Sequence, residues 1–486
     1  MWMGIDLGTQ GVRAMIVDDE GTVHGSGSAP LASHRAGDRH EQSSDDWWTA
    51  VVGASRAALR DGHRPRALAI CSTSGTVLLT DRHGRATTPA VMYDDGRAPG
   101  RGPGRALWLR SAYGPGRVTH QADLIASRLA GRPLPTDSSH ALKTGYDPEQ
   151  EVFDTPGLPA ADLPDVVRPG TVIGEVDRAA AATTGIAAGT AIVAGMTDGC
   201  AAQIASGALS VGSWNAVLGT TLVLKGVTAT PLRDPSGVVY SHRSPDGVWL
   251  PGGASSVGGG ALRAAFPEAD PASFDTLAAA YEPAGAVAYP LVGQGERFPF
   301  LAPDAKPFVL GAPRSDGELW AALLQGVALV ERLCLDYLDL LGAPVDAALT
   351  CTGGAVRSAY WTRLRAEVSG RTMRVPFCAE PALGMAVLAA YGVEGTASLA
   401  AVARRMVRPG EEFAPRGGGR FTEPYLTLVA ELERRGWLPG PVAAHARART
   451  EKTHASCTTD PTDPANPMDP TDPTDRMDPT DPSDPA

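Results

Sequence analysis

One short pattern occurs twice in this chain: an apolar strand runs into a glycine and a hydroxyl, and a second apolar strand follows. The copies read IDLGTQGVRAMIV at residues 5–17 and AVLGTTLVL at residues 216–224. Each predicts a β-hairpin whose tight turn exposes backbone N–H groups beside a hydroxyl, which suits a phosphate. An ordinary hairpin with a glycine turn fits either copy taken alone. Two copies, one in each half, predict two related domains that face each other across a cleft.

The first copy also carries an acid. Asp6 lies at the end of the first strand, two residues before the turn Gly8-Thr9-Gln10-Gly11. We expect its carboxylate to point into the same space, where a Mg²⁺ ion that accompanies a nucleotide would sit. The chain has no GxxxxGK[ST] loop, so phosphate binding at this turn excludes a P-loop fold.

Composition narrows the class of protein. A length of 486 residues predicts two or three domains, and 43% hydrophobic with 20% charged residues is typical of a globular protein. The net charge of −11 argues against nucleic acid as a partner. Six scattered cysteines with no CxxC spacing indicate free thiols in a reducing compartment. No secretory leader and no long apolar run are found, so we expect a cytoplasmic protein without membrane contact.

Strand-like and helical stretches alternate along the chain, which indicates an α/β fold. TAIVAGMTDGCAAQIASGAL at 190–209 predicts a buried strand, a turn and a small-residue helix. LTCTGGAVRSAYWTRLRAEVSG at 349–370 predicts a strand, a Gly-Gly turn and an amphipathic helix, and 317–341 has apolar residues at helical spacing.

The end of the chain changes character at about residue 441. Residues 460–486 are a degenerate Asp-Pro-Thr repeat with eight aspartates and one arginine, a net charge of −7. Such a segment cannot bury a core, so we expect residues 441–486 to form a disordered tail. A solubilising role is favoured over a docking role.

Four separated motifs together resemble the FGGY carbohydrate kinases. In order they are IDLGTQGVR, GMTDGCAAQIASGAL, LGTTLVLKG and TGGAVRSAYWTRLRAEVSG. The resemblance covers residues 1 to about 440. It implies two actin/hexokinase-type (ribonuclease H-like) ATPase domains that face a central cleft. The expected divisions are 1–210 for the sugar-binding and catalytic domain, 211–440 for the nucleotide-binding domain and 441–486 for the tail.

Further stretches resemble the D-ribulokinase-like, xylulokinase-related branch of that family. They are residues 41–51, 72–98, 120–132, 141–149, 239–262 and 289–300. They lie outside the ATPase motifs, so this resemblance concerns the identity of the sugar substrate and not only the binding of ATP. The chain departs from the family pattern at Gln10, which stands where Ser or Thr is usual, and at Ser138-Ser139-His140, which replaces a more Asn-rich segment.

The resemblance implies a set of phosphoryl-transfer residues. Asp198 is the general base, and the start of a helix favours its ionised form. An acidic helix cap is the alternative for Asp198 on local sequence alone, and the GMTDGCAA context favours catalysis. Asp6 positions Mg²⁺. The expected ATP contacts are Thr9, Gln10, Gly11 and Arg13 from the first turn, Gly219, Thr220 and Thr221 from the second, and Gly353, Gly354 and Arg357 beside the adenosine.

The sugar side is expected at two turns. Tyr93-Asp94-Asp95-Gly96-Arg97 resembles the family's aromatic-x-Asp-x-Arg segment, in which the acid accepts hydrogen bonds from sugar hydroxyls. Asp95 is the expected acceptor and Tyr93 a stacking wall, whereas a polar turn is the alternative. Ser72, Thr73 and Ser74 line the second turn.

The leading hypothesis is therefore an ATP- and Mg²⁺-dependent kinase that converts D-ribulose to D-ribulose 5-phosphate. A xylulokinase or another ketose or polyol kinase is the nearest alternative, because such sugars differ by as little as one hydroxyl. An actin-like nucleotide switch and a catalytically silent sugar sensor are alternatives of other classes, and the Asp198 motif counts against the switch. A homodimer is also left open.

Overall fold

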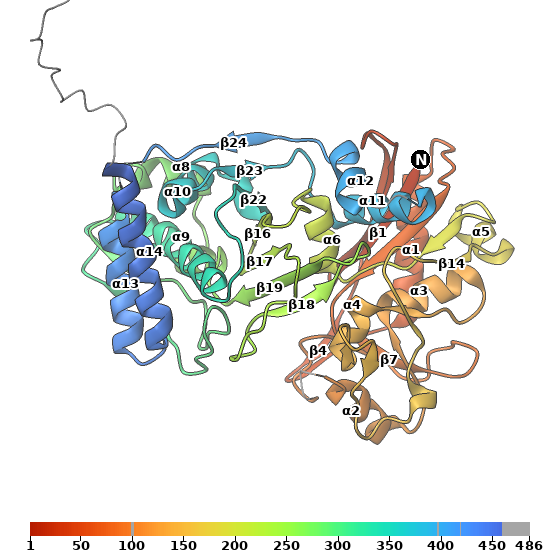
Figure 1. Ribbon diagram of the computed structural model, residues 1–486. Coiled ribbons are helices and arrows are strands. Elements are labelled where there is room, and N and C mark those ends of the chain that lie inside the picture. Colours follow the sequence, from red (N-terminus) through yellow and green to blue (C-terminus); the bar gives the residue numbers. More distant parts are fainter. Residues whose placement is uncertain (99–101, 396–397, 418, 459–486) are drawn as a thin grey trace, which may run out of the picture.

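A computed structural model of the chain describes residues 1–98, 102–395, 398–417 and 419–458. It has two halves, each built around a central β-sheet with helices packed against it (Figure 1). This is the α/β organisation that the alternating strands and helices predict. Within the described residues, no helix has the length and apolar character needed to cross a membrane.

The sheet of the first half has six strands. In order across the sheet these are β14 (Val172–Glu175), β15 (Ala191–Val193), β6 (Ala67–Ser72), β1 (Trp2–Leu7), β2 (Gly11–Val17) and β3 (Val23–Pro30). β1, β6 and β15 are parallel, so their carboxyl ends meet at one edge. β1 and β2 pair antiparallel from Trp2 opposite Val17 to Leu7 opposite Val12, which confirms the first predicted hairpin.

The sheet of the second half repeats this plan with one extra strand. Its order is β18 (Tyr240–Arg243), β19 (Trp249–Ser255), β17 (Leu222–Gly226), β16 (Trp214–Leu218), β22 (Leu349–Thr352), β23 (Met373–Val375) and β24 (Glu411–Phe413). From β19 to β24 each strand has the same neighbours and relative direction as its counterpart from β3 to β14. The second predicted hairpin is the β16–β17 pair. The shared order supports a common plan for both halves.

Alternating side chains on β1 explain why helices cover both faces of the first sheet. Met3, Ile5 and Leu7 join the core beneath α1 and α3, whereas Trp2 joins the core beneath α6, α11 and α12. The helices of this half are α1 (Ser44–Ala58), α2 (Gly104–Tyr113), α3 (Gln121–Ala130), α4 (Ser138–Ala141), α5 (Arg178–Thr184) and α6 (Asp198–Ala205), with 3-10 turns η1 (Leu142–Thr144) and η2 (Ala160–Asp162).

Both halves also contain smaller β-sheets beside the central one. A five-stranded sheet in the first half has the order β4 (His34–Ala36), β5 (Arg39–Gln42), β8 (Ala90–Val91), β7 (Val77–Thr80) and β9 (Arg117–His120). Two-stranded pairs join β10 (Thr136–Asp137) to β13 (Val166–Val167), β11 (Tyr146–Asp147) to β12 (Val152–Phe153), and β20 (Val287–Tyr289) to β21 (Phe308–Leu310).

The core of the second half surrounds one long helix, α9 (Asp316–Leu340), where the sequence predicts a helix at 317–341. Ser315 caps its first turn by accepting the backbone N–H of Glu318. The other helices of the C-terminal part of the chain are α7 (Gly260–Ala265), α8 (Pro271–Ala278), η3 (Gly354–Arg357), α10 (Ala359–Ser369), α11 (Pro381–Glu394), α12 (Leu399–Met406), α13 (Thr422–Arg434) and α14 (Gly440–Thr458).

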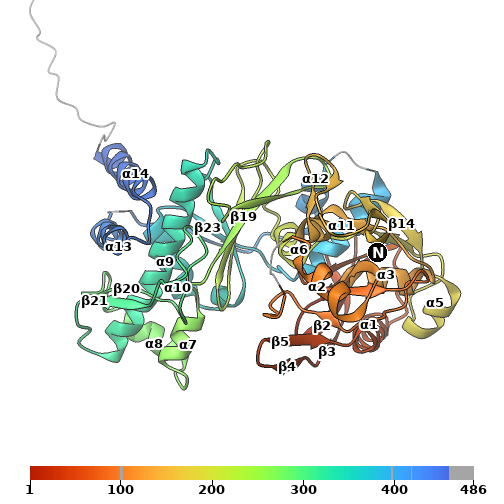
Figure 2. The same ribbon diagram turned by 90° about the horizontal axis from the view of Figure 1, so that it is seen from below.

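Two of these late helices belong to the first half. Figures 1 and 2 both place α11 and α12, in blue, among the red and orange elements of that half. α11 packs so closely on β1 that a Cβ atom on Gly4 would lie 1.7 Å from the carbonyl oxygen of Ala382. A contiguous second domain at 211–440 therefore does not describe the packing, because the chain returns to the first sheet at residue 381.

The expected tail also begins too early. Residues 440–458 form α14, which packs beside α13 and α9 at the end of the second half, as Figure 1 shows. Val442, Ala443 and Ala446 are buried there, and Arg449 pairs with Asp336, Asp339 and Asp346. These apolar contacts and ion pairs explain why the chain stays ordered past residue 441. Residues 459–486, which contain the Asp-Pro-Thr repeat, lie outside the described residues.

Candidate active site

Each predicted phosphate turn is closed by one backbone hydrogen bond of 3.0 Å, but the two turns differ in length. The N–H of Gly8 donates to the carbonyl of Gly11 across four residues, and the N–H of Gly219 donates to the carbonyl of Thr221 across three. Thr9, Gln10, Thr220 and Thr221 are at least partly exposed. The backbone behind the first turn is fixed, because Gln42 Nε2 donates to the Thr9 carbonyl at 2.7 Å.

Asp198 is the first residue of α6 and lies at the carboxyl edge of the first sheet. Thr197, the preceding residue, forms a parallel bridge with Ser72 at the end of β6. Asp198 is a partly buried residue, and its carboxylate accepts the N–H of Gly199 at 2.7 Å. The structure thus places the expected base at a helix start.

The environment of Asp198 is electrostatically mixed. Burial raises the pKa of its carboxyl above the ordinary value, and the Gly199 N–H partly offsets this effect. The positive charges of His140, Lys225 and Lys143 also lower the pKa. A carboxylate whose pKa lies above its ordinary value, yet which is supported in its ionised form, suits proton abstraction near neutral pH.

Asp6 points to the face of the first sheet that α6 covers, the helix that begins with Asp198, and is only 6% exposed. Its partners are weak: the Cys71 thiol at 3.5 Å and an Arg13 guanidinium nitrogen at 3.7 Å. Burial and the charge of Asp198 raise the pKa of Asp6 to about 6. Arg13 itself is mostly exposed and lies between Asp6 and Glu380.

A cavity of about 880 Å³ in the second half is lined by two of the three expected adenosine contacts, Gly354 and Arg357. Gly219, Gly354 and Arg357 line it together with Leu262, Trp320, Leu324, Tyr360 and Trp361. This size and mixed lining are typical of a small-ligand pocket. Gly353 precedes it with φ of +87°, and a Cβ there would lie 2.6 Å from the Leu218 carbonyl oxygen, so the turn requires glycine.

The serine and threonine turn after β6 is mostly buried. Ser72 and Thr73 are 0% and 2% exposed, and the Thr73 hydroxyl is held by Gln121 and Thr76. The Ser74 hydroxyl is also buried but has no hydrogen-bond partner among the described residues. Of the three expected sugar contacts, only Ser74 offers an unused hydroxyl in this geometry.

Asp95 contradicts the expectation of a free sugar acceptor. The residue is 2% exposed, and both carboxylate oxygens are occupied by Arg97 and by the N–H of His40. Although burial opposes ionisation, these bonds hold the pKa of Asp95 below its ordinary value. The carboxylate therefore secures the segment, whereas Tyr93 is 43% exposed and remains available as a wall.

Sequence reasoning missed several charged residues near Asp198. Lys225 is 6% exposed on β17 of the second half, and its ammonium donates to His242 Nδ1 at 3.0 Å. The ammonium of Lys143 in η1 lies 3.5 Å from the centre of the ring of Tyr240 on β18, so this contact connects the first half to the second. A lysine within an otherwise apolar strand, LVLKG at residues 222–226, is the feature of the sequence that could have marked Lys225 as a site residue.

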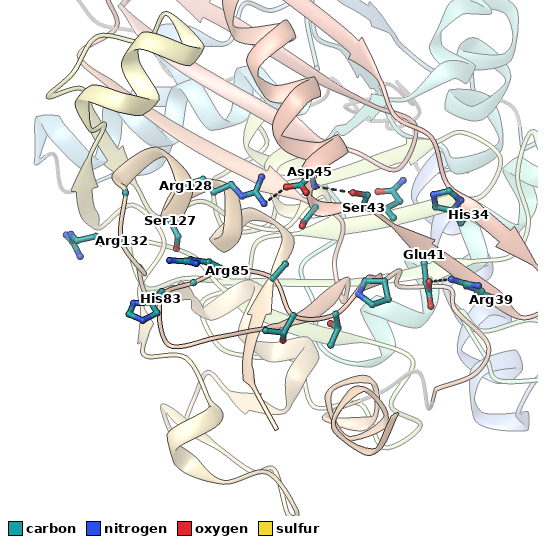
Figure 3. A pocket seen from close by; sticks show the side chains of 18 residues that line it. His34, Arg39, Glu41, Ser43, Asp45, His83, Arg85, Ser127, Arg128 and Arg132 are labelled. Atoms are coloured by element: carbon teal, nitrogen blue, oxygen red, sulfur yellow. Dashed lines mark hydrogen bonds and ion pairs between the residues drawn. The ribbon is translucent and has the colours of Figure 1, made fainter. Parts of the chain in front are cut away.

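A second large cavity lies on the first half and has a different character. It measures about 840 Å³ and is lined by the arginines and acids that Figure 3 labels. Its acids are already paired, Glu41 with Arg39 at 2.6 Å and Asp45 with Arg128 at 2.7 Å. None of the expected site residues lines this cavity.

Two sheets of common order, with an acid at the edge of one and a nucleotide-sized cavity on the other, are the features of a two-domain kinase. Comparison with protein families agrees. The N-terminal domain of the FGGY family of carbohydrate kinases matches residues 1–101, and its C-terminal domain matches residues 214–393. The chain belongs to the FGGY family of carbohydrate kinases, and it is a sugar kinase, a class that uses ATP.

Individual relatives extend the match over most of the chain. A xylulose kinase of Streptomyces rubiginosus is 29% identical over 83% of this chain and 90% of its own. An autoinducer-2 kinase of Photorhabdus laumondii is 26% identical over 85% of this chain and 90% of its own. The crystal structure of a xylulose kinase from Rhodospirillum rubrum has a TM-score of 0.80 at 24% identity, covering 89% of this chain and 99% of that one. This likeness confirms the expected two-domain α/β fold.

Proposed function

We propose that this sugar kinase phosphorylates the terminal hydroxyl of a ketopentose, with D-ribulose as the preferred substrate. The long stretches that resemble the D-ribulokinase-like branch, including residues 72–98 and 239–262, support this choice. D-xylulose is the second candidate, because several relatives are xylulose kinases. The two sugars differ at one hydroxyl, so a single hydrogen-bond partner decides between them.

One observation carries the proposed chemistry: Asp198 is a partly buried acid at the start of α6, and this burial raises the pKa of its carboxyl. In the proposed reaction it takes the proton of the C5 hydroxyl as that oxygen attacks the γ-phosphorus of ATP, and ADP leaves. The Gly199 N–H and the helix dipole favour the charged form that accepts the proton.

Asp6 fits a role beside Mg²⁺. The described residues contain no group of three or more His, Cys, Asp or Glu side chains that would hold a metal ion by themselves. Asp6 is a nearly buried acid with weak partners, and its pKa is raised by burial and by Asp198, a situation that a nearby cation relieves. Bound Mg²⁺ would neutralise charge on the phosphates and keep most of its water ligands.

The nucleotide contacts follow from the two turns and the 880 Å³ cavity. We assign the adenosine to Gly354 and Arg357, and the phosphates to the turns at Thr9–Gly11 and Gly219–Thr221, with Arg13 nearby. We also assign sugar binding and catalysis to residues 1–210, joined by α11 and α12, and nucleotide binding to the second sheet. Closure of the two domains would exclude water that competes for the phosphoryl group.

The test is ADP formation by the purified full chain with Mg-ATP and a panel of D-ribulose, D-xylulose, L-ribulose, ribitol and glycerol. We expect the highest kcat/KM with D-ribulose. Preference for another sugar would overturn the substrate and leave the kinase standing. ATP hydrolysis with no dependence on any sugar would instead favour the nucleotide switch, and sugar binding without turnover would favour the sensor. A homodimer stays a prediction, which the mass in solution by light scattering measures.

A further inference from the structure

The segment where the chain departs from the family pattern, Ser138-Ser139-His140, forms a buried hydrogen-bonded unit with Asp137. Asp137 Oδ1 accepts the N–H groups of Ser139 at 2.8 Å and His140 at 3.1 Å, so it caps α4. Asp137 Oδ2 lies 2.5 Å from His140 Nδ1. The exposed fractions of Asp137 and His140 are 3% and 0%, so no solvent competes for these bonds.

This unit bonds to both turns that surround the proposed reaction. His140 Nε2 lies 2.8 Å from the Ser72 hydroxyl, at the start of the serine and threonine turn. The Ser139 hydroxyl donates to Asp137 Oδ1 at 2.6 Å and accepts the N–H of Thr197 at 2.9 Å. Thr197 is the residue directly before Asp198. Four consecutive residues thus connect the sugar turn to the backbone of the proposed base.

The charge of this unit favours a protonated imidazole. Burial alone would lower the pKa of His140, but the adjacent Asp137 carboxylate outweighs it, and the pKa is raised to about 9. Asp123 on α3 and Asp198 on α6 contribute to the same rise. The remaining titratable groups that face His140 are His120, whose ring centre lies 5.9 Å away, and His242 on β18.

We propose that His140, held by Asp137, is a positioning residue that keeps a fixed positive charge beside Asp198 and ties the sugar turn to the residue before it. The effect on catalysis rests on the proposed function, because it requires Asp198 to act as the base. The imidazolium and the two ammonium groups then hold Asp198 ionised despite its burial. The groups that act on Asp198 are His140, Lys225, Lys143 and the N–H of Gly199, with Asp6 as the opposing charge.

A neighbouring trio offers a matched control. His120 Nδ1 lies 2.8 Å from Asp123 Oδ2, and His120 Nε2 lies 2.8 Å from the Thr144 hydroxyl. His120 is as buried as His140 and makes the same Asp–His–hydroxyl chain, but it bonds neither Ser72 nor Thr197. His120→Gln therefore reports the general cost of replacing a buried histidine.

The first experiment is independent of catalysis. The imidazole signals of isotopically labelled histidines are followed by NMR from pH 5 to 10 in the wild type, Asp137→Asn and Asp198→Asn proteins. We expect His140 to stay protonated past pH 8, to deprotonate at least one pH unit lower in Asp137→Asn, and to shift down in Asp198→Asn. A His140 that titrates at or below the ordinary histidine pKa, or that ignores Asp137, overturns the inference.

The second experiment measures kcat/KM for the sugar against pH. His140→Gln keeps a donor of similar reach and removes the charge, so the acid limb should move up by about one pH unit. His120→Gln should leave the limb in place. Ser139→Ala removes the hydrogen bond to Thr197 but keeps the charge of His140, so it should lower kcat without moving the acid limb.

An unmoved acid limb in His140→Gln, with an active wild type, overturns this inference alone. An inactive wild type overturns the proposed function, and the NMR titration still decides the charge of His140.

Discussion

The carboxylates of Asp6 and Asp198 act on each other across the carboxyl edge of the first sheet. Asp6 is the second-last residue of β1, and Asp198 begins α6, the helix that follows β15; β6 lies between β1 and β15 in the sheet order. Burial together with the charge of Asp198 raises the pKa of Asp6 to about 6. The apoprotein therefore carries an electrostatic cost at the place where we propose that cation and phosphate bind.

Because of this cost, we expect Asp6→Asn to stabilise the protein without bound nucleotide and to lower the rate of sugar phosphorylation. Between pH 4 and 6 the folded chain binds more protons at Asp6 than the unfolded chain, so wild-type stability falls as pH rises through this window. Asparagine removes that loss and should add roughly 1–3 kcal/mol to the free energy of unfolding at pH 7.

The measurement is urea unfolding of both proteins at pH 4 and pH 7 without nucleotide. The gain should be large at pH 7 and small at pH 4, whereas sugar phosphorylation should drop at both. An Asp6→Asn protein that is less stable than the wild type at pH 7 would contradict the raised pKa.

Gly354→Val tests the nucleotide pocket. No atom lies within 4 Å of the Cβ position of Gly354, and this residue lines the 880 Å³ cavity, so a valine side chain would fill space that we assign to adenosine. Crowding of about 1–3 kcal/mol corresponds to a rise of roughly 5- to 150-fold in KM for ATP. KM for the sugar should stay within about twofold of the wild-type value.

Gly293→Val is the control for this change, since its Cβ position is also open but lies outside the cavity. Steady-state kinetics with either substrate varied distinguishes the two variants. Equal KM values for ATP in Gly354→Val and wild type would place adenosine elsewhere.

Gly4→Ala tests the return of α11 to the first sheet. A Cβ on Gly4 would lie 1.7 Å from the Ala382 carbonyl oxygen, which is backbone and cannot rotate away. We expect a loss of about 2 kcal/mol or more in unfolding free energy, because strand and helix must separate. Gly53→Ala in α1 is the matched change: its nearest atom would be 3.7 Å away, so it should stabilise by about 0.5–1 kcal/mol. Calorimetry that finds both variants equally stable would contradict this packing.

Local patterns predicted the parts of the structure that depend on neighbouring residues. Both hairpins, the helix that begins at Asp198 and the long helix α9 follow from strand alternation, glycine turns and helical spacing. Features that depend on distant partners were missed. α11, which begins at residue 381, packs on β1, which ends at residue 7, and the sequence around residue 381 does not indicate this distant partner.

The residues of the candidate site also divide into those that a local motif predicts and those that depend on distant partners. Asp6, Asp198 and the glycine turns carry motifs that predict phosphate chemistry. Asp95 also carries a motif, but its carboxylate is occupied by the N–H of His40, 55 residues earlier, together with Arg97. The effect of Lys225 and His140 on Asp198 could not be predicted from the sequence, because only the fold brings their charges close to that carboxylate.

The most direct test of the account is the rate of sugar-dependent ADP formation by Asp198→Asn at saturating ATP and sugar. Asparagine keeps the shape of the side chain and removes the proton acceptor, so kcat should fall by roughly 10²- to 10⁴-fold. ATP binding and the thermal unfolding midpoint should stay close to those of the wild type. A variant that is folded, binds ATP and keeps more than about a tenth of wild-type kcat would contradict the assignment of Asp198 as the general base.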